Sequence, residues 1–349
     1  KIPTSEYLEN GKYPIIDQGQ NDIAGYYDSD DGLFEDVPTI VFGDHTRIVK
    51  YIDKPCFLGA DGVKLLCPVS KDTNCKYLFY QLAHADIPNT GYNRHFKWIK
   101  ALNFKIPSSD EQNHVVEVLD KVTELISLRK QQLARLDELV KARFVEMFGD
   151  AKLNPYDFPC NSLSEYILFL TSGSRGWSQY FTDNGEYFIT IKNVKNCRIT
   201  LQDVQYVIPP DNAEAKRTKV QENDLLISIT ADLGRTGVVP KEIAKHGAYI
   251  NQHLICIRLN LEKVNPIYVA YYMESDAGKE QFASKNQSAV KAGLNFNAIN
   301  SLKLIVPPLS LQNDFAAFVE RVDQQKQTVQ QSLEKLELMK KALMQEYFG

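Results

Sequence analysis

The sequence predicts a mixed α/β (α+β) fold with a pseudo-twofold internal repeat, in which two globular domains are separated by an antiparallel pair of long coiled-coil helices. Two observations carry this prediction. Residues 96–149 match residues 296–349 at a shift of 200 without a gap, and the repeated segment changes from strand-like to heptad spacing. We expect four parts with boundaries at 1–107, 108–149, 150–307 and 308–349. Residues 1–107 and 150–307 are called the first and second head.

The repeat matches residue types that a shared helical periodicity alone would not match. The matched pairs include Pro107 with Pro307, Gln112 with Gln312, Asn113 with Asn313, and Phe148-Gly149 with Phe348-Gly349. Upstream the similarity is looser, with residues 77–80 resembling 268–271 and residues 11–15 resembling 185–189. Residues 151–174 have no counterpart in the first half. We therefore expect the first head to begin partway through its domain, whether the sequence is trimmed or the gene product is naturally incomplete.

The short, mixed pattern of the two heads is typical of α/β domains. In the first head, residues 39–42 and 63–66 are expected to form strands and residues 77–83 a short helix. In the second head, strands are expected at residues 187–191, 224–229 and 253–259, and the matching helix at residues 266–273.

After each head, the apolar residues follow alternating steps of three and four, which indicates an amphipathic helix with a heptad seam. The first seam comprises Val115, Leu119, Val122, Ile126, Leu133, Leu136, Val140 and Met147, interrupted by Arg129. The second comprises Phe315, Val319, Val322, Val329, Leu333, Leu336, Leu343 and Tyr347, interrupted by Lys326 and Lys340. Each helix of about 38 residues would span roughly 55–60 Å.

Ser109 is the expected N-cap of the first helix, with Gln112 completing a capping box, and Ser310 and Asn313 repeat this cap in altered form. A helix this long with one apolar stripe must bury the stripe. Two such helices can bury their stripes on each other and act as a rigid spacer. The alternative is that each helix packs on its own head.

The loops of both heads are rich in side chains suited to DNA. Arginine can pair with guanine and asparagine with adenine, whereas lysine suits phosphate contact. The candidate DNA-binding residues of the first head are His45, Thr46, Arg47, Tyr92, Asn93, Arg94, His95 and Lys97. Those of the second head are Ser174, Arg175, Trp177, Lys192, Asn193, Thr230, Arg235, Thr236, Gln252 and Lys291. Lys195 and Arg198 lie in the same basic segment as Lys192.

Each of these loops also has a simpler interpretation. A single basic loop is more often a solvated surface than a nucleic-acid site, Trp98 and Trp177 could be packing anchors, and His253 could be a hydrogen-bonded core residue. The duplication of the loops on a spacer is what favours DNA binding.

The composition sets further limits. The net charge of −4 argues against a protein that coats nucleic acid indiscriminately, although local basic surfaces remain compatible with it. The six cysteines form no C-x-x-C pair, so we expect reduced thiols, a cytoplasmic location and no metal site. No apolar run is long enough to cross a membrane.

Motifs of catalysis are also lacking. The sequence contains no phosphate-binding loop, no dinucleotide fingerprint, no nucleophile elbow and no H-E-x-x-H motif. Asp44, His45 and Cys56 could be imagined as a nucleophile set, but their spacing is generic. We expect no catalytic residues in this chain.

The order of variable domain, long helix, variable domain and long helix resembles the specificity subunits of Type I restriction–modification enzymes. Residues 106–112, Ile-Pro-Ser-Ser-Asp-Glu-Gln, look like the turn that precedes the helix in this family. Residues 306–312, Val-Pro-Pro-Leu-Ser-Leu-Gln, are the second copy, in which Leu311 replaces the usual glutamate. Residues 13–15 with Gly19, and Gly173-Ser174 before Gly185, look like the openings of target-recognition domains.

The resemblance implies a non-catalytic subunit that reads a bipartite site in double-stranded DNA, with one target-recognition domain for each half-site. It implies two methyltransferase subunits that carry S-adenosylmethionine, and restriction/translocase subunits that use ATP and Mg, as partners. The chain itself would bind no cofactor. The alternative function is a coiled-coil scaffold with two protein-binding heads. A recognition subunit that works with a lone methyltransferase would share the fold. The target bases and the gap between half-sites stay open.

Overall fold

The computed structural model describes residues 2–59, 62–285 and 293–349. It contains two compact units, which are described separately: unit 1 comprises residues 1–133 and 328–349, and unit 2 comprises residues 134–327. The two long helices, α3 (Ser109–Phe148) and α9 (Leu309–Phe348), have 40 residues each, close to the expected length. Each helix contributes one end to each unit.

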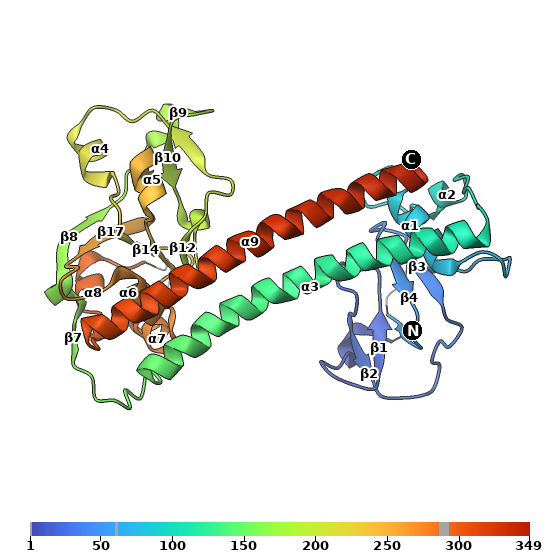
Figure 1. Cartoon of the computed structure of the whole chain (residues 1–349), viewed down its shortest axis with the longest axis horizontal. Coiled ribbons are helices and arrows are strands. Elements are labelled where there is room, and N and C mark those ends of the chain that lie inside the picture. Colours follow the sequence, from blue (N-terminus) through green and yellow to red (C-terminus); the bar gives the residue numbers. More distant parts are fainter. Residues whose placement is uncertain (1, 60–61, 286–292) are drawn as a thin grey trace. The chain divides into compact units, whose positions relative to one another are not determined.

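The described residues of unit 1 form two three-stranded sheets (Figure 1). The first has the order β2 (Gly25–Tyr27), β1 (Tyr13–Ile16), β5 (Phe57–Leu58), and the second β4 (Val49–Ile52), β3 (Thr39–Gly43), β6 (Val63–Leu66). Helix α1 (Cys75–His84) packs on β3 and β4, and α2 (Phe96–Ile99) follows it in sequence. The expected strands at 39–42 and 63–66 and the expected helix at 77–83 are confirmed.

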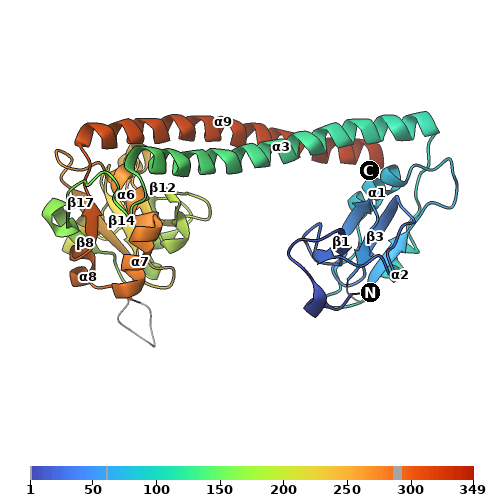
Figure 2. The same ribbon diagram turned by 90° about the horizontal axis from the view of Figure 1, so that it is seen from below.

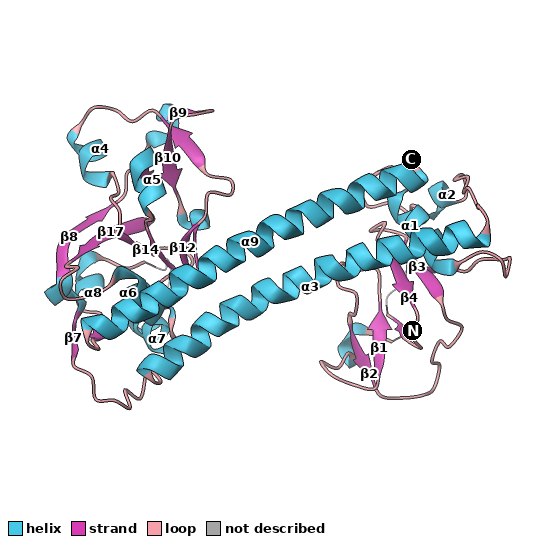
Figure 3. Cartoon of the chain, viewed as in Figure 1, coloured by secondary structure: helices cyan, strands magenta, loops and turns pink. Residues whose placement is uncertain are grey.

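Unit 2, where the structure describes it, has a six-stranded sheet, a four-stranded sheet and a strand pair (Figure 3). The six-stranded order is β11 (Val194–Lys195), β12 (Cys197–Ile199), β15 (Thr236–Val238), β14 (Leu225–Ser228), β17 (Leu254–Leu259), β8 (Ile167–Ser172). The four-stranded order is β16 (Ala248–Ile250), β10 (Glu186–Ile189), β13 (Gln205–Val207), β9 (Phe181–Thr182), and β18 (Lys303–Ile305) pairs with β7 (Cys160–Ser162). The three strands expected in this head are therefore present.

Five short helices complete unit 2. They are α4 (Ala213–Thr218), α5 (Lys241–His246), α6 (Pro266–Glu274), α7 (Asp276–Lys285) and α8 (Phe296–Asn300) among the described residues. Helix α6 packs on β12 and β15 and lies beside α7 (Figure 2). It matches the helix expected at residues 266–273, and α1 is its counterpart in unit 1.

The strand pairing confirms the internal repeat. Strand β1 pairs antiparallel with β2 and parallel with β5, just as β10 pairs antiparallel with β13 and parallel with β16. Strand β3 pairs antiparallel with β4 and β6, as β14 does with β15 and β17. Unit 2 adds β7 and β8, which come from the leading stretch without a counterpart, whereas β6 has no second neighbour among the described residues.

The two long helices are antiparallel in each unit. In unit 1, Leu119 near the start of α3 packs against Met344 near the end of α9, and Val122 and Ile126 pack against Leu333. In unit 2, Phe144 near the end of α3 packs against Phe315 near the start of α9, with ring centroids 5.4 Å apart. The mutual burial expected from the heptad seams is confirmed.

The long helices also pack on the heads. Both arrangements that the sequence allowed, packing of the helices on each other and packing on the heads, are therefore present. Tyr77 and Tyr80 of α1 are buried against Val115 and Leu119. Each head also receives the end of the other repeat's helix, because Phe348 contacts Tyr77 in unit 1 and Phe148 contacts the equivalent Tyr268 in unit 2. Their ring centroids are 5.3 Å and 4.7 Å apart, respectively.

The expected helix caps are wrong, because α3 begins at Ser109 and α9 at Leu309, so that Ser108 and Pro308 precede them rather than Ser109 and Ser310. The cap of α3 is Ser108, whose hydroxyl and backbone N–H contact the Glu111 carboxylate at 2.9 and 3.1 Å. Gln112 instead accepts from the backbone N–H of Asn74 at 2.8 Å, and Gln312 accepts from that of Asn265 at 2.9 Å. The capping box of α3 therefore consists of Ser108 and Glu111, one residue earlier than expected. The Gln112 side chain bonds to the start of α1 instead.

Candidate nucleic-acid interface

In unit 1, the two polar loops expected to bind DNA are tied together by Asp44. The Asp44 carbonyl accepts from the backbone N–H of His95 at 2.8 Å, and its carboxylate accepts from the backbone N–H of Phe96 at 2.8 Å. A ring nitrogen of His95 lies 3.0 Å from the same carbonyl. Residues 44–47 and 87–95, which we call loop pair 1, therefore form one connected surface element.

An aromatic pair stands at the centre of loop pair 1. The rings of His45 and Tyr92 are stacked, with centroids 4.8 Å apart and an interplanar angle of 10°. Tyr92 is 89% exposed, so its outer face is open to solvent. Gly91 precedes it with a φ of 76°, a conformation that favours glycine. The loop thus presents an open aromatic face of the kind on which an unstacked base or a sugar can pack.

The cations of loop pair 1 differ in availability. Arg94 and Lys97 are exposed, as are Thr46 and Asn93. Arg47 is half-buried, and its guanidinium donates to the Ile87 carbonyl at 3.0 Å. Contact with a nucleic acid would fall first to Arg94 and Lys97, because Arg47 already holds the second loop.

His95 is fully buried, which does not fit direct contact with DNA. One ring nitrogen lies near the Asp44 carbonyl, and the other lies 3.3 Å from the Thr90 hydroxyl. Its role in this structure is to hold loop pair 1 together.

The segment after β14 in unit 2 is held by the same backbone bonds as the segment after β3 in unit 1, and the Ile229 carbonyl accepts from the backbone N–H of Leu294 at 3.0 Å as the Asp44 carbonyl does from that of His95. The backbone N–H of Ile229 donates to the His253 carbonyl at 3.0 Å, as that of Asp44 donates to the Gly62 carbonyl at 2.7 Å. The Thr230 hydroxyl lies 2.8 Å from one ring nitrogen of His253, and the Gln252 amide lies 3.1 Å from the other. Residues 229–235 and 251–253, which we call loop pair 2, bring Thr230 and Gln252 together through a histidine that was not among the candidates.

Arg235 also belongs to loop pair 2. It forms an ion pair with Asp232 at 2.5 Å, and its side chain is 37% exposed. Its backbone N–H donates to the Ser228 hydroxyl at 2.9 Å, which anchors the loop to the end of β14. The guanidinium is therefore held near the surface by a neighbour rather than free.

Four candidates of the second head are buried, so the structure does not present them at the surface. They are Ser174, Trp177, Asn193 and Thr236. The Ser174 hydroxyl lies 3.1 Å from that of Thr218, and Trp177 packs on Phe188 and Tyr249 as an anchor of the core.

The other two buried candidates are fully hydrogen-bonded within the protein. The Asn193 amide donates to the carbonyls of Thr200 and Gln202 at 3.1 and 3.2 Å. The Thr236 hydroxyl donates to the Ala270 carbonyl at 3.1 Å and contacts the Glu274 carboxylate at 3.0 Å. Arg175 and Lys192 are exposed, and Lys291 lies outside the described residues.

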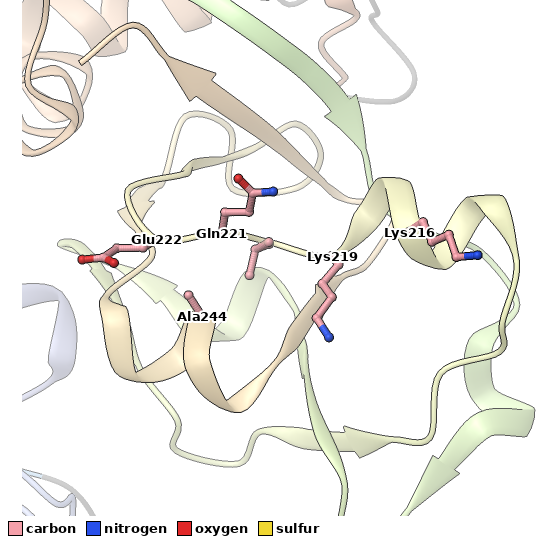
Figure 4. A pocket seen from close by; sticks show the side chains of 6 residues that line it. Lys216, Lys219, Gln221, Glu222 and Ala244 are labelled. Atoms are coloured by element: carbon pink, nitrogen blue, oxygen red, sulfur yellow. The ribbon is translucent and has the colours of Figure 1, made fainter. Parts of the chain in front are cut away.

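A hollow of about 370 Å³ near α4 was not expected from the sequence (Figure 4). Lys216 and Lys219 line it together with Glu222. Both lysines are paired, Lys216 with Asp211 at 3.0 Å and Lys219 with Glu186 at 2.8 Å. The hydrogen bond to Glu186 raises the pKa of Lys219, so its charge is already compensated within the protein.

Cys56, one of the three residues that could be imagined as a nucleophile set, is fully buried. Burial raises the pKa of the Cys56 thiol to about 11, so the thiol stays protonated at neutral pH. The described residues contain no cluster of three or more His, Cys, Asp or Glu side chains that could hold a metal ion. In the same described part of the chain, no helix has both the length and the apolar character to cross a membrane.

Comparisons with known proteins agree on one family. The family model described as "Type I restriction modification DNA specificity domain" matches residues 1–138 and 172–338. The putative type I restriction enzyme MjaX specificity subunit of Methanocaldococcus jannaschii is 22% identical over 330 residues, covering 85% of this chain and 73% of the relative. The EcoR124I/EcoR124II specificity subunit of Escherichia coli is 22% identical over 353 residues, covering 92% and 82%.

Solved structures show the same fold. The crystal structure of the S subunit of a Type I restriction–modification system from M. genitalium matches with a TM-score of 0.60 and 16% identity, covering 99% of this chain and 91% of that chain. A chain from a structural study of complex assembly and conformational transition of the type I R-M system matches with a TM-score of 0.50 and 15% identity, covering 90% and 82%.

Proposed function

Because the chain belongs to the family of Type I restriction–modification DNA specificity subunits, we propose that it reads a bipartite site in double-stranded DNA through loop pairs 1 and 2. Each head reads one half-site. The observation that carries this proposal is a repeated backbone arrangement: the first residue after β3 and the first after β14 donate to Gly62 and to His253, and their carbonyls accept from the backbone N–H groups of His95 and Leu294.

The exposed side chains of each head suit two kinds of contact. Arg94 in unit 1 can donate two hydrogen bonds to guanine, Asn93 can donate one to adenine and accept one from it, and Tyr92 can pack on a sugar or base. Lys97 in unit 1 and Lys192 in unit 2 suit phosphate contact, which fixes register without reading sequence. Specificity then resides in the few arginine, asparagine and glutamine side chains of the loop pairs.

The long helices have two roles in this proposal. A helix of 40 residues spans about 60 Å, longer than the roughly 34 Å of one turn of DNA, so the pair can set a fixed gap between half-sites. The helices also carry apolar side chains that the chain itself leaves exposed. On α3, Leu125 and Leu128 are 42% and 50% exposed in unit 1, and Leu139 and Val145 are 46% and 56% exposed in unit 2.

We assign these exposed residues of α3 to the docking of two methyltransferase subunits, which bring S-adenosylmethionine. Restriction/translocase subunits bring ATP and Mg. This chain holds no cofactor and performs no chemical step; it selects the sequence on which its partners act.

Selection from a pool of random duplexes by the full chain with its methyltransferase partners tests the proposal. We expect two short conserved blocks separated by a fixed number of unread base pairs. The affinity should fall steeply between about 50 and 200 mM salt, because phosphate contacts release counterions. A protein-binding scaffold would select no sequence and show no such salt dependence, and that result would refute the proposal.

A further inference from the structure

The second head is joined to the long helices by a cluster of four charges. Arg198 on β12 donates through Nε to Asp323 of α9 at 2.7 Å, and its Nη1 lies 3.8 Å from Asp137 of α3. Lys326 of α9 forms an ion pair with the same Asp137. Arg198, Asp137, Asp323 and Lys326, which we call the clasp, therefore link one strand of the head to both helices.

The clasp is electrically balanced and partly shielded from water. It contains two cations and two anions, and the side chain of Arg198 is 28% exposed, against 36% for Asp323 and 40% for Asp137. Dissolved salt screens such a partly buried network less than it screens an ion pair on the surface. The planar guanidinium of Arg198 also fixes the direction of its hydrogen bonds as well as their length. The clasp thus restricts how the head can rotate on the helices.

Unit 1 joins its head to the helices through residues at other positions. The positions that correspond to Asp323 and Lys326 are Thr123 and Ile126, which cannot form the clasp. The β11–β12 hairpin that supplies Arg198 has no counterpart among the described strands of unit 1. There, Lys76 of α1 forms an ion pair with Asp120 of α3 at 2.7 Å, and the Tyr80 hydroxyl donates to the same carboxylate at 2.6 Å.

We propose that Arg198 is a positioning residue that fixes the orientation of the second head on its helices and thereby sets a single permitted gap between the two half-sites. The inference rests on the proposed function. It assigns Arg198 no contact with bases, although the residue lies in a basic segment that the sequence grouped with DNA-binding candidates. Loss of the clasp should leave the half-site sequences unchanged and broaden the range of gaps that the chain accepts.

The test compares four variants of the full chain. Arg198→Met removes the positive charge, and Arg198→Lys keeps the charge but lacks the planar guanidinium group. The double variant Arg198→Asp with Asp323→Arg exchanges the two charges and so restores the ion pair in reverse. Lys195→Met is the matched control, because Lys195 is an exposed cation on the neighbouring strand β11. Two measurements are made: hydrogen exchange of residues 194–199 in the free chain, and selection from duplexes whose half-sites are separated by varied gaps.

We expect Arg198→Met to speed exchange in the hairpin and to lower the preference for the best gap over its neighbours by about fivefold to tenfold. The gap preference of Arg198→Lys should lie between that of Arg198→Met and that of the original chain. The charge swap should recover most of the gap preference, and Lys195→Met should leave the gap preference unchanged. Faster exchange with an unchanged gap preference, or altered half-site bases, would overturn the inference alone. Failure of the original chain to select any bipartite site would instead overturn the proposed function, and the inference with it.

Discussion

The side-chain oxygen of Gln112 accepts a hydrogen bond from the backbone N–H of Asn74 at 2.8 Å. The amide of Asn74 in turn donates to Asn113 at 2.9 Å, and its own oxygen caps the first turn of α1. The first turn of a head helix is therefore bonded to the first turn of a long helix. The same joint recurs in unit 2, where Asn265 contacts Gln312 and Asn313, both at 2.9 Å.

This joint supports the first prediction. Gln112 is 1% exposed and also donates to the Pro107 carbonyl at 2.9 Å, so Gln112→Leu deprives the partly buried backbone groups of Asn74 and Pro107 of this partner. We expect a loss of about 1–3 kcal/mol in the free energy of unfolding. Hydrogen exchange should become faster in α1 and stay unchanged in α6. Gln312→Leu is the matched control and should give the reverse pattern; equal changes in both helices after either substitution would contradict independent joints.

The second prediction concerns the ends of the long helices. Phe148 is 4% exposed and packs on Phe144, Tyr268 and Phe315, whereas Phe348 is only half-buried. Phe148→Ala should lower the free energy of unfolding by about 3–5 kcal/mol, the usual range for a fully buried phenylalanine. Phe348→Ala should lower it by less, because less apolar surface returns to water. Urea denaturation measures both, and a larger effect at Phe348 would contradict the burial described here.

The third prediction uses a difference between the repeats within the seam. Burial lowers the pKa of Lys340, and the charge of Lys130 adds to this effect, whereas the corresponding position in the first helix is the buried Val140. The folded state thus disfavours the charged lysine. Lys340→Val should raise the free energy of unfolding at pH 7, by on the order of 1 kcal/mol.

The pH dependence of this gain has a definite sign. Since the folded pKa of Lys340 is lowered, the unfolded chain holds the proton more tightly, and the stability of the original chain rises as the pH increases through the folded pKa toward the ordinary lysine value of about 10.4. The electrostatic part of the increase in the free energy of unfolding that Lys340→Val causes should be largest below this pH range. It should decrease as the pH rises through the range. Thermal unfolding from pH 7 to pH 10 measures this, and a gain that grows with pH would show that the sign is wrong.

The sequence predicted the periodic features of this fold correctly because they depend on local spacing. The seams through Leu119 and Val319 are buried, and the repeat at a shift of 200 corresponds to a repeated joint. The end of the first seam was predicted wrongly. Met147 was expected to be its last buried residue, but Phe144 and Phe148 are buried there and Met147 is only partly buried. There the helix packs on a head as well as on α9, and a second packing partner is not visible in heptad spacing.

The candidate site was harder to predict because residue type does not reveal the bonding partner. His95, Asn193 and Thr236 have polar side chains in or beside loops, which suggested contact with DNA. In the structure their partners are distant in sequence, such as Asp44 for His95 and Glu274 for Thr236. Arg198 is a further case, because its partner Asp323 lies 125 residues away. No local pattern encodes such pairings.

The final prediction separates the two reading surfaces. Arg94 is exposed on loop pair 1, and Arg235 lies on loop pair 2 beside Asp232. Arg94→Ala should relax reading of one half-site and Arg235→Ala that of the other, each by about 1–3 kcal/mol of base discrimination. Methylation mapping with reconstituted partner subunits measures both half-sites at once. Lys97→Ala is the control, since loss of a phosphate contact should weaken binding uniformly. If either arginine variant altered both half-sites equally, the heads would not read independently, and the division of the site between loop pairs 1 and 2 would have to be abandoned.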